Sequence, residues 1–240
     1  FKTHEQVQTI TVLPKRYPVP YLNLPGGRTY QRGGVSLASR VGESQEFMSL
    51  RDYRHGDPIK NIHWKSLAKR GKPVVKEHQD EYFTRHALVL DTFFDGDPDI
   101  FEQAVSVAAS LATSARTEDG LLDLMFVGDK AYKFTTGRGL AHLEQLLEVL
   151  ATVSPSPDQS FLTLVKAVEE HLQVLSGTVL VLMSWDKKRE LLLQSVKARA
   201  VPVVCMVVCP DDEDLDLPPG VMHIRPEHLK DDLAQEMVLL

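Results

Sequence analysis

Three aspartates follow predicted strands at positions where their carboxylates could share a divalent cation. Asp91 ends the apolar run 86–91, Asp95 comes four residues later, and Asp186 comes shortly after the apolar run 178–183. Parallel strands place their carboxyl ends at one edge of a sheet, and doubly wound folds bind ligands at that edge. Because hard carboxylate oxygens suit Mg²⁺, the three residues are candidate metal ligands. The competing interpretation is that Asp91 only ends a strand and that Asp186 only caps a helix.

His63 is the other candidate for chemistry, as a general base. A metal-dependent hydrolase could combine it with the three aspartates if the segment around it folded over the sheet edge. That segment offers one histidine beside basic residues and one aspartate, which is neither a metal set nor a nucleophile–base pair. We therefore expect no catalytic residues. The glycine pairs at 26–27 and 33–34 lack the Gly-Lys-Ser/Thr of a P-loop, so nucleotide hydrolysis by this chain is not expected.

The elements that would position these residues alternate from residue 86 onward between short apolar runs and amphipathic helical stripes, which is typical of a parallel sheet covered on both faces. Strands are predicted at 86–91, 121–127, 131–135, 178–183, 203–208 and 221–224, and helices after Asp97-Pro98 and at 140–151, 161–172, 187–199 and 228–239. The short connection 128–130 requires an antiparallel hairpin. The predicted fold class is a three-layer, doubly wound α/β sandwich with a mostly parallel sheet, its first strand central and a hairpin at one edge.

The front of the chain differs from the rest. Residues 1–85 are predicted to form an extended, loop-rich arm, and residues 86–240 the α/β domain. The stretch 7–13 alternates like a strand, 17–40 is rich in Pro and Gly, and the arm has no core large enough to stand alone. The arm holds 15 Lys and Arg against 8 Asp and Glu, whereas 86–240 hold 12 against 25. This asymmetry indicates either two faces that pack together or two different partners.

Several classes of protein are disfavoured by composition. No apolar run approaches the ~20 residues needed to cross a bilayer, and no signal peptide is evident, so the chain as given is expected to be soluble. It begins at Phe1 and not at Met, which indicates an excised fragment. The basic front lacks a nucleic-acid-binding signature, and we expect no nucleic-acid partner. Cys205 and Cys209 would lie ~13 Å apart on one strand, too far for a disulfide, and are interpreted as small buried residues in a reducing compartment.

The segment 47–71 carries many particular residue types at fixed offsets. It reads FMSLRDYRHGDPIKNIHWKSLAKRG. This segment resembles the hallmark of the family called domain of unknown function 58 (DUF58), which combines Phe, Leu-Arg-x-Tyr, Gly-Asp and Ile-His-Trp-Lys/Arg-x-Ser/Thr-Ala-x-x-Gly. The candidate motif and partner-binding residues are Arg51, Tyr53, His55, Gly56, Asp57, His63, Trp64 and Lys65. Gly56 and Asp57 belong to a predicted turn, in which Asp57 could cap the following turn.

The resemblance implies a fold, a partner and a location. The fold is von Willebrand A-like, in agreement with the element order. The partner is a MoxR-type AAA+ ATPase, in a chaperone-like or assembly system that acts on a client protein which the sequence does not identify. The location is the cytoplasmic side of the bacterial inner membrane, with anchoring helices upstream of this chain.

The resemblance also bears on the metal site. Proteins with a von Willebrand A fold often hold Mg²⁺ through Asp-x-Ser-x-Ser after the first strand, together with a Thr and an Asp from neighbouring loops. Here Phe93 and Asp95 stand at the two serine positions after Asp91. This implies a degenerate metal site, and no resident cofactor is expected, with Mg²⁺ as the alternative. We predict a non-catalytic interaction module; the alternatives are a divalent-metal-dependent hydrolase at the sheet edge and a purely structural scaffold.

Overall fold

The fold divides the chain into two compact units. A computed structural model describes residues 11–19, 47–57, 59, 62–78, 84–114, 120–137, 140–211 and 216–236. One unit comprises residues 30–83 and contains the motif at 47–71; we call it the motif unit. The other comprises residues 1–29 and 84–240 and is called the α/β domain.

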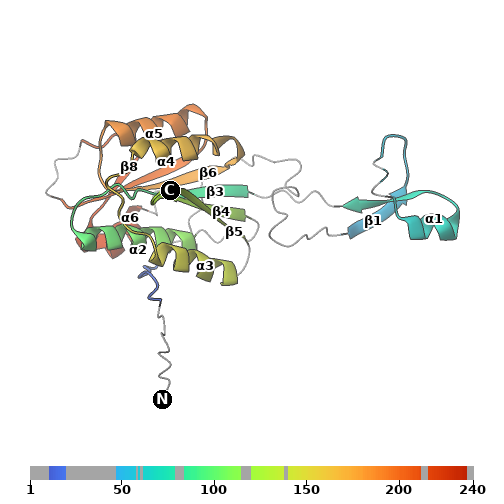
Figure 1. The fold of residues 1–240 in the computed structure, drawn as a ribbon, viewed down its shortest axis with the longest axis horizontal. Helices are drawn as coiled ribbons and strands as arrows, with labels where there is room; N and C mark the ends of the chain where they lie inside the picture. Colours follow the sequence, from blue (N-terminus) through green and yellow to red (C-terminus); the bar gives the residue numbers. More distant parts are fainter. Residues whose placement is uncertain are drawn as a thin grey trace, which may run out of the picture. The chain divides into compact units, whose positions relative to one another are not determined.

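The α/β domain is built on a six-stranded sheet with the strand order β5-β4-β3-β6-β7-β8 (Figure 1). Its strands are β3 (Thr84–Leu90), β4 (Gly120–Val127), β5 (Ala131–Thr136), β6 (Gly177–Leu182), β7 (Val203–Val208) and β8 (Val221–Ile224). All neighbours are parallel except β4 and β5, which form an antiparallel pair. The first strand of the domain therefore lies in the middle and the hairpin forms one edge, as the sequence predicts.

Helices cover both faces of this sheet and give the predicted three layers. They are α2 (Pro98–Ser114), α3 (Leu140–Ala151), α4 (Phe161–Glu169), α5 (Lys187–Ala198) and α6 (Leu229–Glu236), with short 3₁₀ segments η3 (Leu172–Val174) and η4 (Pro226–His228). Helices α2, α3 and α6 pack on one face, and α4 and α5 on the other (Figure 1). The mostly parallel, doubly wound architecture predicted from the sequence is confirmed.

Helix limits follow local chemistry. Helix α2 begins at Pro98, which has no N–H that would need a partner. The side chain of Asp97 accepts a 3.0 Å hydrogen bond from the backbone N–H of Asp99. Helix α4 ends at Glu169, earlier than the predicted 172. A 3₁₀ turn follows, which allows both Leu172 and Leu175 to reach the core. The predicted last helix is observed from 229 to 236, and residues 237–240 lie outside the described residues.

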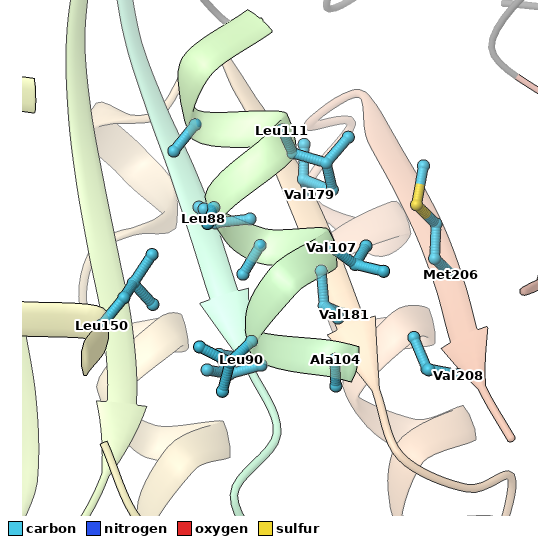
Figure 2. Packing of buried hydrophobic residues seen from close by; sticks show 14 of the residues in the cluster. Leu88, Leu90, Ala104, Val107, Leu111, Leu150, Val179, Val181, Met206 and Val208 are labelled. Carbon is cyan, nitrogen blue, oxygen red and sulfur yellow. The ribbon is translucent and has the colours of Figure 1, made fainter. Parts of the chain in front are cut away.

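The core beneath α2 is made by alternate strand residues and the apolar face of the helix (Figure 2). The strands contribute Leu88, Leu90, Val179, Val181, Met206 and Val208, and the helices contribute Ala104, Val107, Leu111 and Leu150. All of these side chains are at most 2 % exposed. Small residues such as Ala104 and Ala108 let the α2 backbone approach the sheet closely, so the larger side chains of both layers are shielded from water.

Residues 11–19 lie along helix α2. The Tyr17 backbone N–H donates to Ser110 Oγ at 2.8 Å, and the Ser114 hydroxyl donates to the Val19 carbonyl at 3.2 Å. Tyr17 and Val19 also pack against the core. Of the strand predicted at 7–13, residues 7–10 lie outside the described residues and residues 11–13 are not in a strand.

The motif unit is a two-stranded hairpin with a short helix in its connection. Strand β1 (Phe47–Asp52) pairs antiparallel with β2 (Val74–His78), and helix α1 (Trp64–Arg70) lies between them in sequence. Ile62 forms an isolated bridge to Val75, which is buried. Gly71 ends the helix in the left-handed conformation, with φ of 66° and its N–H bonded to the Leu67 carbonyl. The sequence predicted a loop-rich region here and missed both the hairpin and the helix.

The buried imidazole of His86 makes the stability of the α/β domain sensitive to pH. Its Nε2 has no hydrogen-bond partner among the described residues, and burial lowers the pKa of His86 below its usual 6.5. When the pKa of a histidine is lower in the folded state than in the unfolded state, protonation favours the unfolded state. Stability is therefore lost as the pH falls below the pKa of the unfolded state. We therefore expect the melting temperature to fall as pH drops below 6.5, and to fall less in His86→Leu than in wild type.

Thermal melts at pH 8 and pH 5 would measure this, with exposed His55→Leu as the matched control. An equal decline in wild type and His86→Leu would contradict the assignment to His86.

Candidate functional site

The first site lies where β3 and β6 end, and Asp91 is at its centre. Asp91 is fully buried. Its Oδ1 accepts the Phe93 N–H at 2.9 Å, and its Oδ2 accepts the Met183 N–H at 3.2 Å and the Arg189 Nε–H at 2.6 Å. Burial raises the pKa of Asp91, while the Arg189 guanidinium and the two backbone N–H groups oppose that rise. Both carboxylate oxygens are therefore engaged by the protein itself.

Asp186 joins Asp91 at this edge, as the sequence predicts. It caps helix α5, since its Oδ1 accepts the Arg189 backbone N–H at 2.9 Å. Its Oδ2 accepts a second bond from Arg189, from Nη1 at 2.7 Å. The two aspartates thus approach each other through one guanidinium group that binds both. We call Asp91, Asp186 and Arg189 the switch-point cluster.

Aromatic residues enclose the guanidinium of the switch-point cluster. The Arg189 Cζ lies 5.0 Å from the centroid of the Phe161 ring, and the Phe93 ring meets Phe161 edge-on with centroids 5.1 Å apart. Arg189 Nη2 also donates to the Phe93 carbonyl at 3.2 Å. The Arg189 side chain is only 7 % exposed. A cation stacked on an aromatic face and stripped of water binds its partners more strongly than one at the surface.

The predicted third metal ligand does not join the other two. Asp95 is exposed and forms no hydrogen bond or ion pair with the described residues. Thr92, between Asp91 and Asp95 in sequence, donates its hydroxyl to the Val127 carbonyl at 2.6 Å. Within the part of the chain that the structure describes, no three His, Cys, Asp or Glu side chains are grouped as a metal site would require. The residues at this edge therefore do not fit a Mg²⁺ ion, which needs free oxygen ligands.

The second site is the motif unit, in which Arg51 and Asp57 hold the turn. Arg51 Nη1 and Nη2 each donate to one Asp57 oxygen at 2.7 Å, which is a bidentate pair. Asp57 Oδ2 also accepts the Arg54 N–H at 2.8 Å. The bond from Arg51 is the main cause that lowers the pKa of Asp57 to about 2. Asp57 therefore binds Arg51 and Arg54, which precede it in sequence. Residues 58, 60 and 61 of the following turn lie outside the described residues, so the cap on that turn stays a prediction.

The other motif residues between 53 and 56 shape the turn. The Tyr53 backbone N–H donates to the Pro73 carbonyl at 3.0 Å, which extends the hairpin by one bond. His55 is exposed, and Gly56 follows with φ of 103°, a conformation that side chains rarely adopt. The Gly-Asp pair of the motif is thus explained by local backbone geometry and by the Arg51 ion pair.

Helix α1 presents the exposed part of the motif. His63 Nδ1 lies 2.7 Å from Ser66 Oγ, so this histidine bonds inside its own helical turn. Trp64 is 60 % exposed, and Lys65 is exposed beside it. Residues four positions apart lie close together on a helix turning 100° per residue, so Trp64 lies beside Ala68, and Lys65 beside Lys69 in the adjoining row. All four residues are exposed, and we call the two rows together the α1 face.

The fold and the two sites define a three-layer α/β protein with a separate hairpin-and-helix unit. The chain belongs to the family described as protein of unknown function DUF58, whose model matches residues 49–227. It is similar to "Uncharacterized protein YeaD" of Bacillus subtilis (strain 168), with 30% identity over 124 residues. That match covers 51% of this chain and 30% of the relative, so the chain corresponds to a minor part of the relative's length. The family resemblance expected from the motif is confirmed.

Membrane attachment was expected only through segments outside this chain. Among the described helices, none combines the length and the apolar character that a bilayer span requires. The longest of them, α2, packs on the sheet and buries every residue from 104 to 112.

Proposed function

We propose that this chain is a non-catalytic protein-interaction module that works beside a MoxR-type AAA+ ATPase. The system would assemble or mature a client protein at the cytoplasmic side of the bacterial inner membrane. The ATPase, the client and the membrane attachment come from the family resemblance of the motif. The observation in this chain that carries the proposal is the exposure of Trp64 on the α1 face.

The motif unit holds this tryptophan on a fixed support. The bidentate bonds from Arg51 to Asp57, the bridge from Ile62 to Val75 and the left-handed end of α1 at Gly71 all restrain the backbone around the helix. Because the backbone that carries this side chain is already ordered, little backbone conformational entropy is lost when a partner covers the tryptophan. Tryptophan is among the residues that most often dominate binding energy at interfaces. The α1 face is therefore well suited to anchor a partner protein.

The charge around Trp64 indicates the chemistry of that partner. Lys65 and Lys69 lie on the α1 face, and Arg70 and Lys72 follow directly in sequence, all exposed. No acidic residue interrupts the sequence from Trp64 to Lys76. Opposite potentials on two surfaces raise the association rate and select the correct orientation. We assign to the AAA+ ATPase an acidic surface with an apolar pocket for the indole ring.

The alternative of a metal-dependent hydrolase is less well supported by the switch-point cluster. Asp91 and Asp186 both bind Arg189, and Asp95 is exposed without a bond to either. A hydrolytic metal needs an open coordination position and free ligands. The exposure of Trp64 favours an interaction module over a pure scaffold, because a scaffold does not require an exposed tryptophan.

Trp64→Ala is expected to weaken binding of the ATPase by at least about 30-fold, because truncating an aromatic hot spot costs about 2 kcal/mol or more. The full-length protein, tagged and purified from its host membranes, would be incubated with the purified ATPase, and affinity measured by surface plasmon resonance. Charge reversal in Lys65→Glu with Lys69→Glu is expected to slow association and to reduce its dependence on salt.

Leu191→Ala is the matched control, since Leu191 is 54 % exposed on α5 of the other unit. It is expected to bind like wild type. Equal affinity of wild type, Trp64→Ala and the double lysine variant would reject the α1 face as the docking surface. Absence of any ATPase binding by the wild-type full-length protein would reject the partner.

A further inference from the structure

We infer that the guanidinium of Arg189 is the resident cation of the switch-point cluster, so that the α/β domain needs no divalent metal ion there. The inference goes beyond the proposed interaction role and rests on a different part of the molecule. It concerns the edge of the sheet where a von Willebrand A-like fold was expected to retain a degenerate Mg²⁺ site.

The first step is the position of the charge. The guanidinium bonds to Oδ2 of Asp91 at 2.6 Å and to Oδ2 of Asp186 at 2.7 Å. These are the two carboxylates that the ends of β3 and β6 bring together, and they were the two best candidate ligands. A cation that bridges them does electrostatically what a metal ion would do, because it neutralises a carboxylate with no access to water.

The second step is the saturation of the oxygen atoms. Asp91 accepts three hydrogen bonds from Phe93, Met183 and Arg189. Asp186 directs one oxygen to the helix N-terminus and the other to the guanidinium. Magnesium requires near-octahedral oxygen coordination at about 2.0–2.1 Å. An ion could meet that requirement only by expelling Arg189 from its place between the aspartates.

The third step is the support given to the arginine itself. Its backbone lies in the first turn of α5, fixed by the Asp186 cap, and its guanidinium packs on the Phe161 ring and donates to the Phe93 carbonyl. Phe93 occupies one of the positions where the metal-binding pattern has serine. The side chain that stands in place of a metal ligand packs edge-on against Phe161, the ring on which the guanidinium lies.

The first experiment tests for divalent binding. The wild-type chain and Asp91→Asn would be titrated with Mg²⁺ and Mn²⁺ up to about 5 mM by calorimetry, which exceeds the ~1 mM dissociation constant of a weak protein site for a divalent cation. Melting temperatures would be measured with each ion and with EDTA. We expect no saturable heat and the same melting temperature in every condition. Binding of about one ion per chain that Asp91→Asn abolishes would overturn the inference.

The second experiment tests whether the charge of Arg189 is what the cluster uses. Arg189→Lys keeps a cation and loses the forked geometry, whereas Arg189→Met keeps much of the length and loses the charge. The expected order of melting temperatures is wild type, then Arg189→Lys, then Arg189→Met. Arg225→Met is the matched control, since Arg225 pairs with Asp232 but is 38 % exposed, and it should lose less than Arg189→Met. A melting temperature for Arg189→Met equal to or above that of Arg189→Lys would overturn the role of the cation.

Discussion

Asp123→Ala is expected to lower the free energy of unfolding of the α/β domain by about 3–5 kcal/mol, as when one partner of a buried ion pair is removed. Asp123 lies on β4 and is fully buried. Its Oδ2 accepts Arg85 Nε at 2.7 Å, and its Oδ1 accepts the Thr135 hydroxyl at 2.7 Å and Arg85 Nη2 at 3.2 Å. Removing the carboxylate leaves Arg85, whose side chain is 13 % exposed, charged and without this partner. The loss would therefore reflect a buried uncompensated charge more than the net worth of the pair.

Two tryptophans allow this loss to be measured in the α/β domain alone. Trp64 belongs to the motif unit, and Trp185 packs partly buried against the core beneath α4 and α5. In a Trp64→Phe background, the fluorescence of Trp185 during urea unfolding reports the α/β domain. Exposed Asp158→Ala is the control and should stay within about 0.5 kcal/mol of the parent. A loss below about 1 kcal/mol for Asp123→Ala would show that Arg85 reaches water when its partner is removed.

The layers of the α/β domain could be predicted because each element carries its own signal. Runs such as 178–183 are continuously apolar, as a strand buried on both faces must be. The cap at Asp186 and the proline after Asp97 mark helix starts locally. The hairpin of β4 and β5 follows from the length of its connection. None of these inferences needs knowledge of which residues touch across the fold.

The motif unit was missed because its elements lack such signals. Helix α1 has seven residues and buries none of them, so no apolar period marks it. Strand β1 pairs with β2 across a connection of more than twenty residues, and short strands with long connections leave no hairpin pattern. One signal was available: a glycine, Gly71, directly after the basic residues Lys69 and Arg70 is typical of the C-terminal end of a helix.

The switch-point cluster was predicted in part for a related reason. Strand ends explain why Asp91 and Asp186 meet. Arg189 could not be paired with Asp91 from the sequence, because the two residues are 98 positions apart and a lysine or arginine early in a helix is ordinarily solvated. The available hint was Phe93, since an aromatic residue at a serine position removes a ligand and adds a ring that packs against Phe161, on which the guanidinium stacks.

Leu111→Ala is the second large effect, an expected loss of about 2–5 kcal/mol in the free energy of unfolding. Leu111 is 1 % exposed on α2 and lies over Val179 of the central sheet (Figure 2). Truncation removes burial of the side chain and leaves a cavity, because the neighbours are fixed in two packed layers. Leu162→Ala on α4 is the same change at 60 % exposure and should cost less than about 1 kcal/mol. The same Trp185 urea experiment compares the two. Equal losses for the two alanine variants would mean that helix propensity, and not core packing, sets both values. Leu111→Met nearly conserves the volume of the side chain and should cost less than about 1.5 kcal/mol. A small loss for Leu111→Met, together with a large difference between the alanine variants, would assign the effect to the cavity.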